Sequence, residues 1–153
     1  MKPTTTLIRF FNIVMAALVA GTIFGIWIGY NPQNLSAPTY IEQQQNTINA
    51  LNTLMPILGL ITILLTITSA IIQRKNKTTF SLLFLAAAFL IISGFTTKFG
   101  NQPINSIVMT WDMNSAPDNW MTLREEWWSF HKIRTLSAFI GLCLIVWASI
   151  RKD

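Results

Sequence analysis

The sequence contains few charged residues, one histidine and one cysteine. Only 11% of its 153 residues are charged and 52% are hydrophobic, whereas a soluble domain has about a quarter of its residues charged. The single Cys143 excludes an intrachain disulfide, and its apolar surroundings predict a buried, unreactive thiol. One His and one Cys are too few for a typical metal site, so we expect no metal. These absences indicate an integral membrane protein.

The excess of positive charge does not indicate a nucleic-acid partner. The net charge is +5 and the pI is about 9.8, but the basic residues lie at the ends of apolar segments. Membrane topology explains such a distribution better than a nucleic-acid surface does. Gly21, Gly25 and Gly29 have the spacing of a helix-packing face, which would permit close packing within a chain or in an oligomer.

Four apolar segments predict an all-α integral membrane four-helix bundle that forms a single domain. Each segment is close to the roughly 20 residues that a helix needs to cross a bilayer. The four spans are residues 7–30, 54–73, 79–98 and 131–150. A cleaved signal peptide is the competing interpretation of the first span, because Lys2 and Arg9 lie at its start, but the apolar run is long for that purpose.

Two helices are expected to continue beyond the membrane and build a polar cap from residues 39–53 and 99–130. The Gln-rich residues before the second span repeat apolar side chains at helical spacing, so we expect one long helix over residues 39–72 with a kink at Pro56. The helix that contains the last span is likewise expected to begin above the membrane. Gly100 is the expected C-cap of the third helix.

The distribution of charge predicts the orientation of the bundle. With four spans, both termini and the loop at 74–77 lie on one side, which should be cytoplasmic because it collects basic residues. These residues are Lys2, Arg9, Arg74, Lys75, Lys77, Arg151 and Lys152. The region between Lys98 and Arg134 also contains basic residues, and topology gives no reason for them on the outer side.

The main functional candidate is a polar stripe on the last helix. Residues three and four apart share a helix face, so Arg124, His131 and Arg134 should lie on the same face as Trp120 and either Trp127 or Trp128. Trp and Arg near a membrane surface usually belong to the aromatic belt or reach toward headgroups, and a single His there usually has a hydrogen-bonding role. Two guanidiniums and an imidazole on one face are costly against lipid, which favours a buried functional site.

The preceding segment adds Asn101 and Asn105, whose amides either bind a ligand or hold a loop in place. A haem b ligated by His131, with a Met or no second ligand, is an alternative use of the site. A bis-His haem is excluded because the chain has one His.

The order and spacing of these residues resemble the anthrone oxygenase-like family of small four-helix membrane proteins. The resemblance rests mainly on Asn101, Asn105, Trp111, Asp112, Pro117, Trp120, Arg124, Trp128, His131, Arg134 and Thr135, and more loosely on Gln44, Met55 and Pro56. The chain differs at Met113 and Asn114, where a Pro-rich turn is more usual.

The resemblance implies oxidation of anthrones, or other lipophilic phenolic or quinol-type aromatics, by molecular oxygen without a cofactor. It implies that His131 is the base and that Arg124 and Arg134 stabilise the developing anion. Asn101 and Asn105 would orient the substrate or the imidazole, and the aromatic residues would stack on a flat ring. Gln44 and Trp111 complete the implied site. An electron-transfer protein and a non-catalytic partner protein remain the alternatives.

Overall fold

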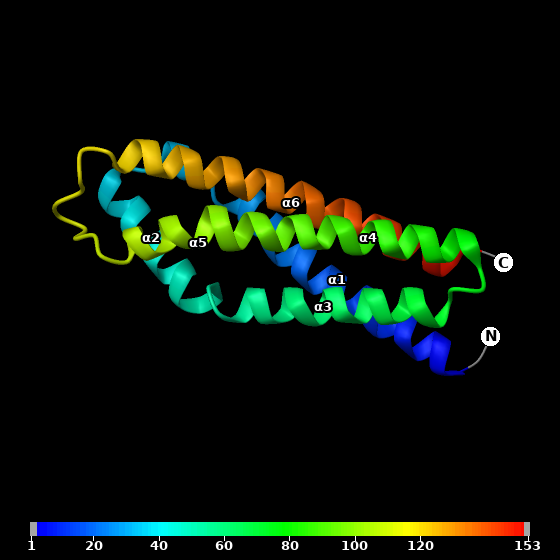
Figure 1. Ribbon diagram of the computed structural model, residues 1–153. Helices are drawn as coiled ribbons and strands as arrows, with labels where there is room; N and C mark the ends of the chain where they lie inside the picture. Colours follow the sequence, from blue (N-terminus) through cyan, green and yellow to red (C-terminus); the bar gives the residue numbers. More distant parts are fainter. Residues whose placement is uncertain (1–2, 152–153) are drawn as a thin grey trace.

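The computed structural model describes residues 3–151 and consists of helices joined by short turns and one longer loop (Figure 1). The α-helices are α1 (Pro3–Gly29), α2 (Ala37–Leu51), α3 (Leu54–Ile72), α4 (Lys77–Thr96), α5 (Gln102–Val108) and α6 (Trp120–Ile150). Helices α1, α3, α4 and α6 are long and apolar enough to cross a membrane. The predicted all-α, four-helix membrane bundle is confirmed.

The four long helices form a ring in which α1 and α4 each pack against both α3 and α6. Both ends of the chain lie at one end of the bundle, and α2, α5 and the loop before α6 lie at the other (Figure 1). Small residues dominate part of the core, where Ala16, Ala70 and Ala86 are almost fully buried beside Leu83 and Ile145. Small side chains allow the helix backbones to approach closely, which is how membrane helices gain packing energy.

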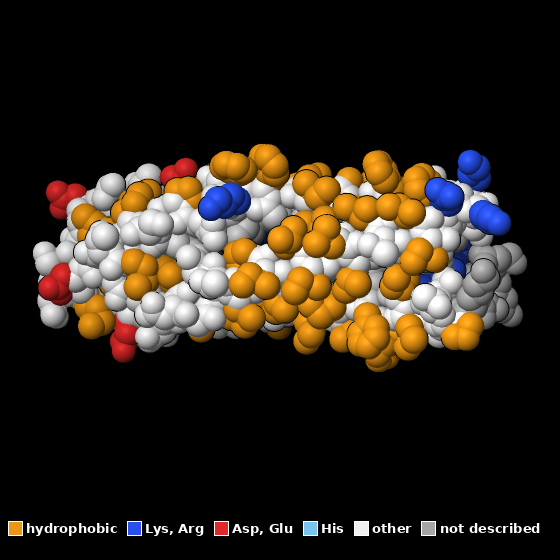
Figure 2. Space-filling view, turned by 60° about the horizontal axis from the view of Figure 1, so that its bottom comes forward, with side chains coloured by type: hydrophobic (Ala, Val, Ile, Leu, Met, Phe, Trp, Pro, Cys, Tyr) orange, Lys and Arg blue, Asp and Glu red, His pale blue; other side chains and the backbone are white. Residues whose placement is uncertain are grey.

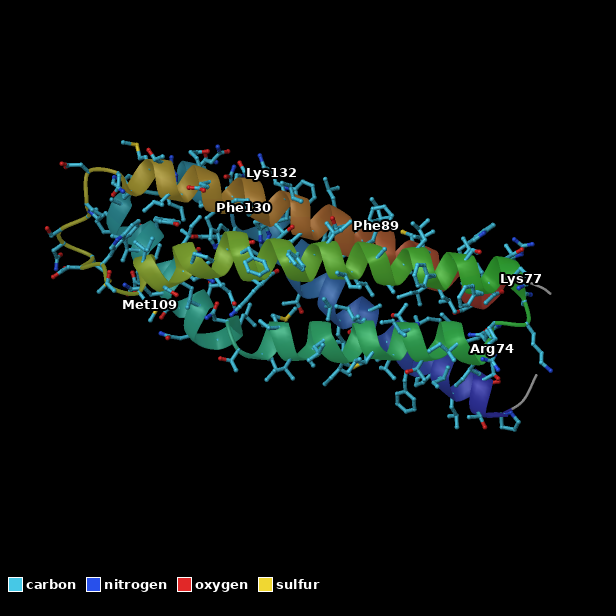
Figure 3. All side chains as sticks on the ribbon, in the orientation of Figure 1. Arg74, Lys77, Phe89, Met109, Phe130 and Lys132 are labelled. Atoms are coloured by element: carbon cyan, nitrogen blue, oxygen red, sulfur yellow. The ribbon has the colours of Figure 1, made fainter. Side chains whose placement is uncertain are left out.

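The surface has the charge pattern of a spanning protein. Figure 2 shows acidic side chains at the end of the bundle with the long loop, basic ones mainly at the opposite end, and hydrophobic ones between them. Arg74 and Lys77 lie at the end that holds the chain termini, whereas Met109 lies at the cap end (Figure 3). Which end faces the cytoplasm stays a prediction, and the basic residues Lys2 and Lys152 lie outside the described residues.

The single long helix predicted over residues 39–72 is wrong, because the chain breaks at Asn52 and Thr53 between α2 and α3. Pro56 explains the position of the break: its ring cannot donate to the carbonyl of Asn52, four residues earlier, and would clash with it in a helix. That freed carbonyl instead accepts a hydrogen bond of 3.3 Å from Gln102 Nε2. The proline therefore ends one helix and leaves an acceptor that fixes α5.

Gly100 is not a C-cap. Helix α4 passes through a π-helical turn, η2 (Thr97–Asn101), directly into α5, and Pro103 lies in the first turn of that helix. A Cβ atom on Gly100 would lie 2.5 Å from Cγ of Phe130 on α6. The glycine is required for close approach of the two helices, because almost any side chain there would displace the ring.

The expectation of a buried Cys143 is wrong, and so is close packing of the α1 glycines within the chain, whereas their packing in an oligomer stays a prediction. Cys143 is exposed on the surface of the bundle and not buried. A Cβ atom added at Gly21, Gly25 or Gly29 would meet no atom within 4 Å, so this face of α1 packs against no other part of the described chain. Helix packing within the chain does not explain the glycine spacing.

Candidate functional site

A mainly apolar cavity of about 220 Å³ lies between the long helices, toward the cap. Its apolar walls include Val19 and Ile23 of α1, Gly59 and Ile63 of α3, and Leu90 of α4, while its polar lining is Ser93, Thr97, Lys98, Gln102 and Arg134. A second cavity of about 30 Å³ adjoins the first on the side of α2. The two cavities share Ile23, Met55, Pro56, Thr97 and Arg134. Arg134 therefore lines both cavities.

Arg134 is a buried cation, 9% exposed, with no carboxylate partner among the described residues. Its Nε and Nη2 atoms lie 3.1 and 2.8 Å from Nδ1 of His131. Its Nη1 atom makes no hydrogen bond within residues 3–151. An unpaired charge is expensive at membrane depth, so this arrangement favours a site for an anionic or strongly polar ligand group.

The hydrogen bonds of His131 determine which ring nitrogen carries the proton. Because a guanidinium only donates, Nδ1 must be the acceptor, and the proton must lie on Nε2. Nε2 lies 3.1 Å from the carbonyl oxygen of Ile23 and so donates to it. His131 is 0% exposed and lines neither cavity. In this structure the imidazole holds Arg134 in place and does not face the space that a ligand would fill.

The rings of Trp127 and Trp128 stack on His131 and not on open space. Their centroids lie 5.0 and 5.3 Å from that of the imidazole, with interplanar angles of 9° and 4°. Trp127 also lines the smaller cavity, and the guanidinium of Arg134 lies 5.6 Å from its ring centroid. Stacking and cation–π contacts thus fix the orientation of the His131–Arg134 pair.

A chain of amide side chains connects the cap to this pair. Tyr30 donates to Gln44 Oε1 at 3.1 Å, and Gln44 Nε2 lies 3.4 Å from Asn105 Oδ1. Asn105 accepts from Trp127 Nε1 and donates to Asn52 Oδ1, both at 2.8 Å. Asn101 is also buried, and its amide nitrogen donates to the carbonyl of Trp127 at 2.9 Å. Of the predicted residues, Gln44 and Asn105 line the smaller cavity together with Arg134, whereas Asn101 is linked to this group only through the carbonyl of Trp127.

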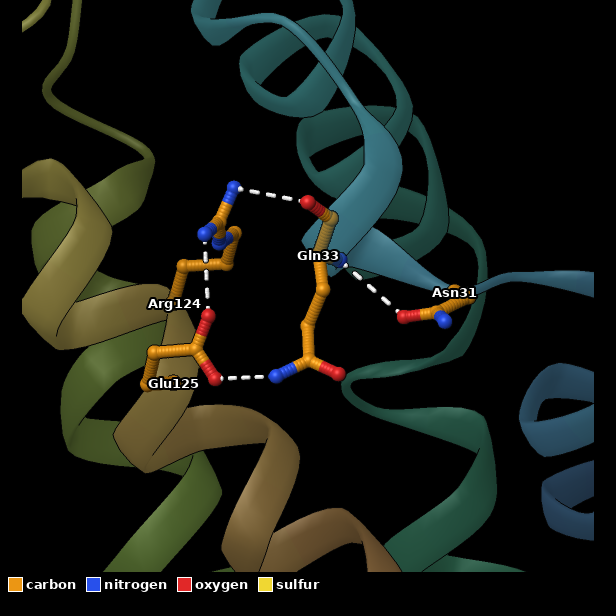
Figure 4. Close-up of polar contacts among 4 residues, drawn as sticks. All are labelled: Asn31, Gln33, Arg124 and Glu125. Atoms are coloured by element: carbon orange, nitrogen blue, oxygen red, sulfur yellow. Dashed lines mark hydrogen bonds and ion pairs between the residues drawn. The ribbon is translucent and has the colours of Figure 1, made fainter.

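Arg124 belongs to a different cluster, at the outer end of α6. It forms an ion pair of 2.9 Å with Glu125 and a long hydrogen bond of 3.4 Å to the carbonyl of Gln33 (Figure 4). Its guanidinium also lies 4.8 Å from the ring centroid of Trp120. The structure does not bring Arg124 to the cavities, so its expected cooperation with Arg134 has no geometric support.

Trp111 and Trp120 also lie in the cap, where both rings contact Tyr40 at centroid distances of 6.4 and 5.9 Å. Tyr40 is fully buried, and its hydroxyl makes no hydrogen bond within the described chain. Burial raises the pKa of this phenol, which stays neutral. Tyr40 packs against both tryptophans in the cap, and none of the three residues lines either cavity.

Lys98 and Gln102, which line the cavity, were not predicted from the sequence, and neither were the amide partners Asn52 and Tyr30. Lys98 carried a usable signal, because it is a basic residue on the side where topology does not require one. In the described chain, no three His, Cys, Asp or Glu side chains are grouped so that they could hold a metal ion.

Comparison with known proteins gives one result. A sequence model of a family described as anthrone oxygenase matches residues 45–144, which is well over half of the chain and includes Arg134, His131 and the amides of α5 and η2. No curated protein and no solved structure matched the chain.

Proposed function

The chain belongs to the anthrone oxygenase family, and we propose that it is a membrane-embedded oxygenase for a lipophilic anthrone, phenol or quinol. The observation that carries the proposal is Arg134, a buried guanidinium that faces an apolar cavity without a carboxylate to neutralise it. An apolar space with one convergent charge suits a flat hydrophobic molecule that becomes anionic at one oxygen.

The proposed reaction needs only the substrate and molecular oxygen. In an anthrone, the methylene carbon opposite the carbonyl loses its two hydrogens and becomes a second carbonyl. One atom of dioxygen enters the product as the new carbonyl oxygen, and the other leaves as water with the two hydrogens. The carbon loses four electrons and dioxygen gains four. Loss of the first proton gives an enolate, which is electron-rich enough to react with oxygen.

Arg134 is proposed to bind the substrate oxygen on which the enolate charge develops. A guanidinium fixed in advance stabilises that charge in a water-poor site without the cost of reorienting solvent. The Nη1 atom is the group best placed to donate, since the Nε and Nη2 atoms are directed at His131. Trp127 lines the smaller cavity and offers an aromatic ring to a substrate that extends into it.

We propose two alternative roles for His131, and each requires a different position of Arg134. As a positioning residue it keeps Arg134 directed at the cavity through Nδ1, as the hydrogen bonds support. As the base implied by the family resemblance it must first release Arg134, because the same Nδ1 lone pair would take the proton. Movement of the guanidinium to the carbonyl oxygen of the neutral substrate would free that lone pair before the proton is removed, and the same guanidinium would then bind the enolate oxygen that forms.

The haem alternative does not fit these residues. A haem iron bound to His131 would need an imidazole nitrogen with open space in front of it. Both nitrogens are hydrogen-bonded and the residue is 0% exposed. We also propose, from the charge distribution, that both termini are cytoplasmic and the site lies toward the outer membrane surface.

Oxygen consumption tests the proposed function. We expect the purified protein in lipid nanodiscs to increase oxygen uptake by anthrone above the rate with empty nanodiscs, with anthraquinone as product and no hydrogen peroxide released. His131→Ala should abolish the increase, because it removes the partner that holds Arg134. An oxygen uptake equal to that of empty nanodiscs would refute the oxygenase proposal for this substrate.

A further inference from the structure

The cavity beside Arg134 is polar at one end only. Lys98, Gln102 and the guanidinium of Arg134 belong to its cap end, while Val19, Ile63 and Leu90 form its inner end. Helix α4 is 20 residues long, which corresponds to about 30 Å, so Lys98 lies about one membrane thickness from Lys77 at the opposite end. The cavity therefore has the same direction of polarity as the adjacent half of a bilayer.

Two glycines lie in the wall of this cavity, on the facing helices α3 and α4. A Cβ atom on Gly59 would meet nothing within 4 Å, and one on Gly94 would meet only Cδ1 of Ile63, at 4.0 Å. Leu60, which also lines the cavity, is 58% exposed on the outer surface of the bundle. The wall between α3 and α4 is thus thin at these glycines and faces the region that lipid would cover.

We infer that the substrate enters this cavity sideways from the bilayer, between α3 and α4 at Gly59 and Gly94. The substrate is a lipophilic amphiphile with one ionisable oxygen, and it arrives with that oxygen already at the level of Arg134. It needs no inversion, because an amphiphile in that leaflet also has its polar group toward the membrane surface. The inference rests on the proposed function in using the same cavity as the substrate site.

A second opening at the cap end competes with this route. A groove lined by Asn52, Lys98, Gln102 and Ser106 lies between the start of α3 and helix α5, and it shares Pro56, Lys98 and Gln102 with the cavity. Its lining includes amide, hydroxyl and ammonium groups, so it is the more polar of the two openings. A flat hydrophobic molecule is concentrated in lipid and dilute in water, so the bilayer route offers it the larger supply.

The test blocks each route separately and measures binding without oxygen. Gly94→Ala, Gly94→Leu and Gly59→Leu narrow the passage on the lipid side, and Ser106→Phe fills the groove without adding a tryptophan. Gly21→Leu and Gly25→Leu are matched controls, because their added side chains also meet nothing within 4 Å but line no described cavity. The readout is the rate at which anthrone dissolved in phosphatidylcholine nanodiscs quenches tryptophan fluorescence after mixing, with saturation as the sign of specific binding. The background is a variant in which the exposed Trp147 is replaced by Phe.

We expect Gly94→Leu and Gly59→Leu to slow anthrone binding by about tenfold or more, because each leucine side chain would occupy open space in the cavity wall that the substrate has to cross. Gly94→Ala should have a smaller effect, and both α1 controls should bind at the parent rate. A parent rate in Gly94→Leu and Gly59→Leu, or slow binding only in Ser106→Phe, would overturn the bilayer route. Binding that depends on the glycines without any oxidation under air would overturn the proposed function alone.

Discussion

Helix α6 carries two buried arginines, and only one of them has a carboxylate beside its guanidinium. Arg124 has a carboxylate, Glu125, at 2.9 Å, and it lies against the ring of Trp120. Arg134 has a neutral imidazole at 2.8 Å as its main partner, and lines a cavity. The charge of Arg124 is thus already compensated within the protein, whereas that of Arg134 is not.

The difference teaches what each arginine can do for a ligand. A neutral imidazole orients a guanidinium without cancelling its charge, so the favourable interaction with an anion is kept for the ligand. A carboxylate would instead cancel that charge before a ligand arrived. The cost of a buried unpaired cation is consistent with a functional role for Arg134 and a structural one for Arg124.

Removing each charge in turn would give the largest contrast. We expect Arg134→Gln to lower kcat/KM for anthrone by about a hundredfold or more, the usual cost of losing a donor to a developing oxyanion. Arg124→Gln should lower it by less than about tenfold. The Tm of Arg134→Gln should not fall, because the variant removes an uncompensated buried charge. Both values come from oxygen uptake and thermal unfolding of the same preparations.

An equal loss of activity in the two arginine variants would contradict the comparison. Arg134→Lys provides the matched control, since it keeps the charge but loses the planar group that contacts His131 through two nitrogens. We expect it to retain more activity than Arg134→Gln and less than the parent. Activity as low as in Arg134→Gln would show that the geometry of the guanidinium matters more than its charge.

Substitutions of His131 would separate a positioning role from a base. Asparagine can offer its amide oxygen to Arg134 in place of Nδ1, whereas leucine offers no acceptor. If the residue only positions Arg134, His131→Asn should retain at least about tenfold more activity than His131→Leu, as for other residues that orient a functional group. If it is the base, neither variant should exceed the background oxygen uptake. Gel filtration of both variants would check that they fold.

The sequence predicted the features that depend on the length of apolar segments and on helical spacing. Apolar length identified the four spans, and helical spacing identified His131 and Arg134 as one face of α6. The same spacing places Arg124 on this face as well, but it does not bring Arg124 close to Arg134. Ten residues along a helix correspond to about 15 Å, which is too far for two guanidiniums to hold one small anion. The axial distance was available from the sequence, whereas the ion pair with Glu125 was not.

Other features of the site could not be predicted because they depend on which helices become neighbours. Nothing in the sequence distinguishes Gly59 and Gly94 from Gly21 and Gly25, yet only Gly59 and Gly94 line a cavity. The break at Asn52 follows from Pro56 by local stereochemistry, but its use as an acceptor for α5 depends on tertiary structure. Helical periodicity predicts which side chains share one face of a helix, but it does not predict which residues of other helices pack against that face.

The smallest expected effect comes from breaking the ion pair of Arg124 itself. Glu125 is 44% exposed at the side chain, so the pair is partly screened by solvent and should contribute no more than about 1 kcal/mol. We therefore expect Glu125→Gln to change Tm by less than about 3 °C and to leave oxygen uptake near the parent value. The neighbouring Glu126, changed to Gln, is the control for the loss of one negative charge.

This weak effect would sharpen the comparison, because Glu125→Gln makes Arg124 resemble Arg134 in having no carboxylate. If an uncompensated guanidinium were sufficient for binding, the variant should gain a second anthrone site, seen as a second phase in the fluorescence titration. We expect no second phase, since Arg124 lines neither cavity. A large loss of oxygen uptake in Glu125→Gln but not in Glu126→Gln would instead place Arg124 in the functional site. Arg124 would then share the functional role that we assign to Arg134.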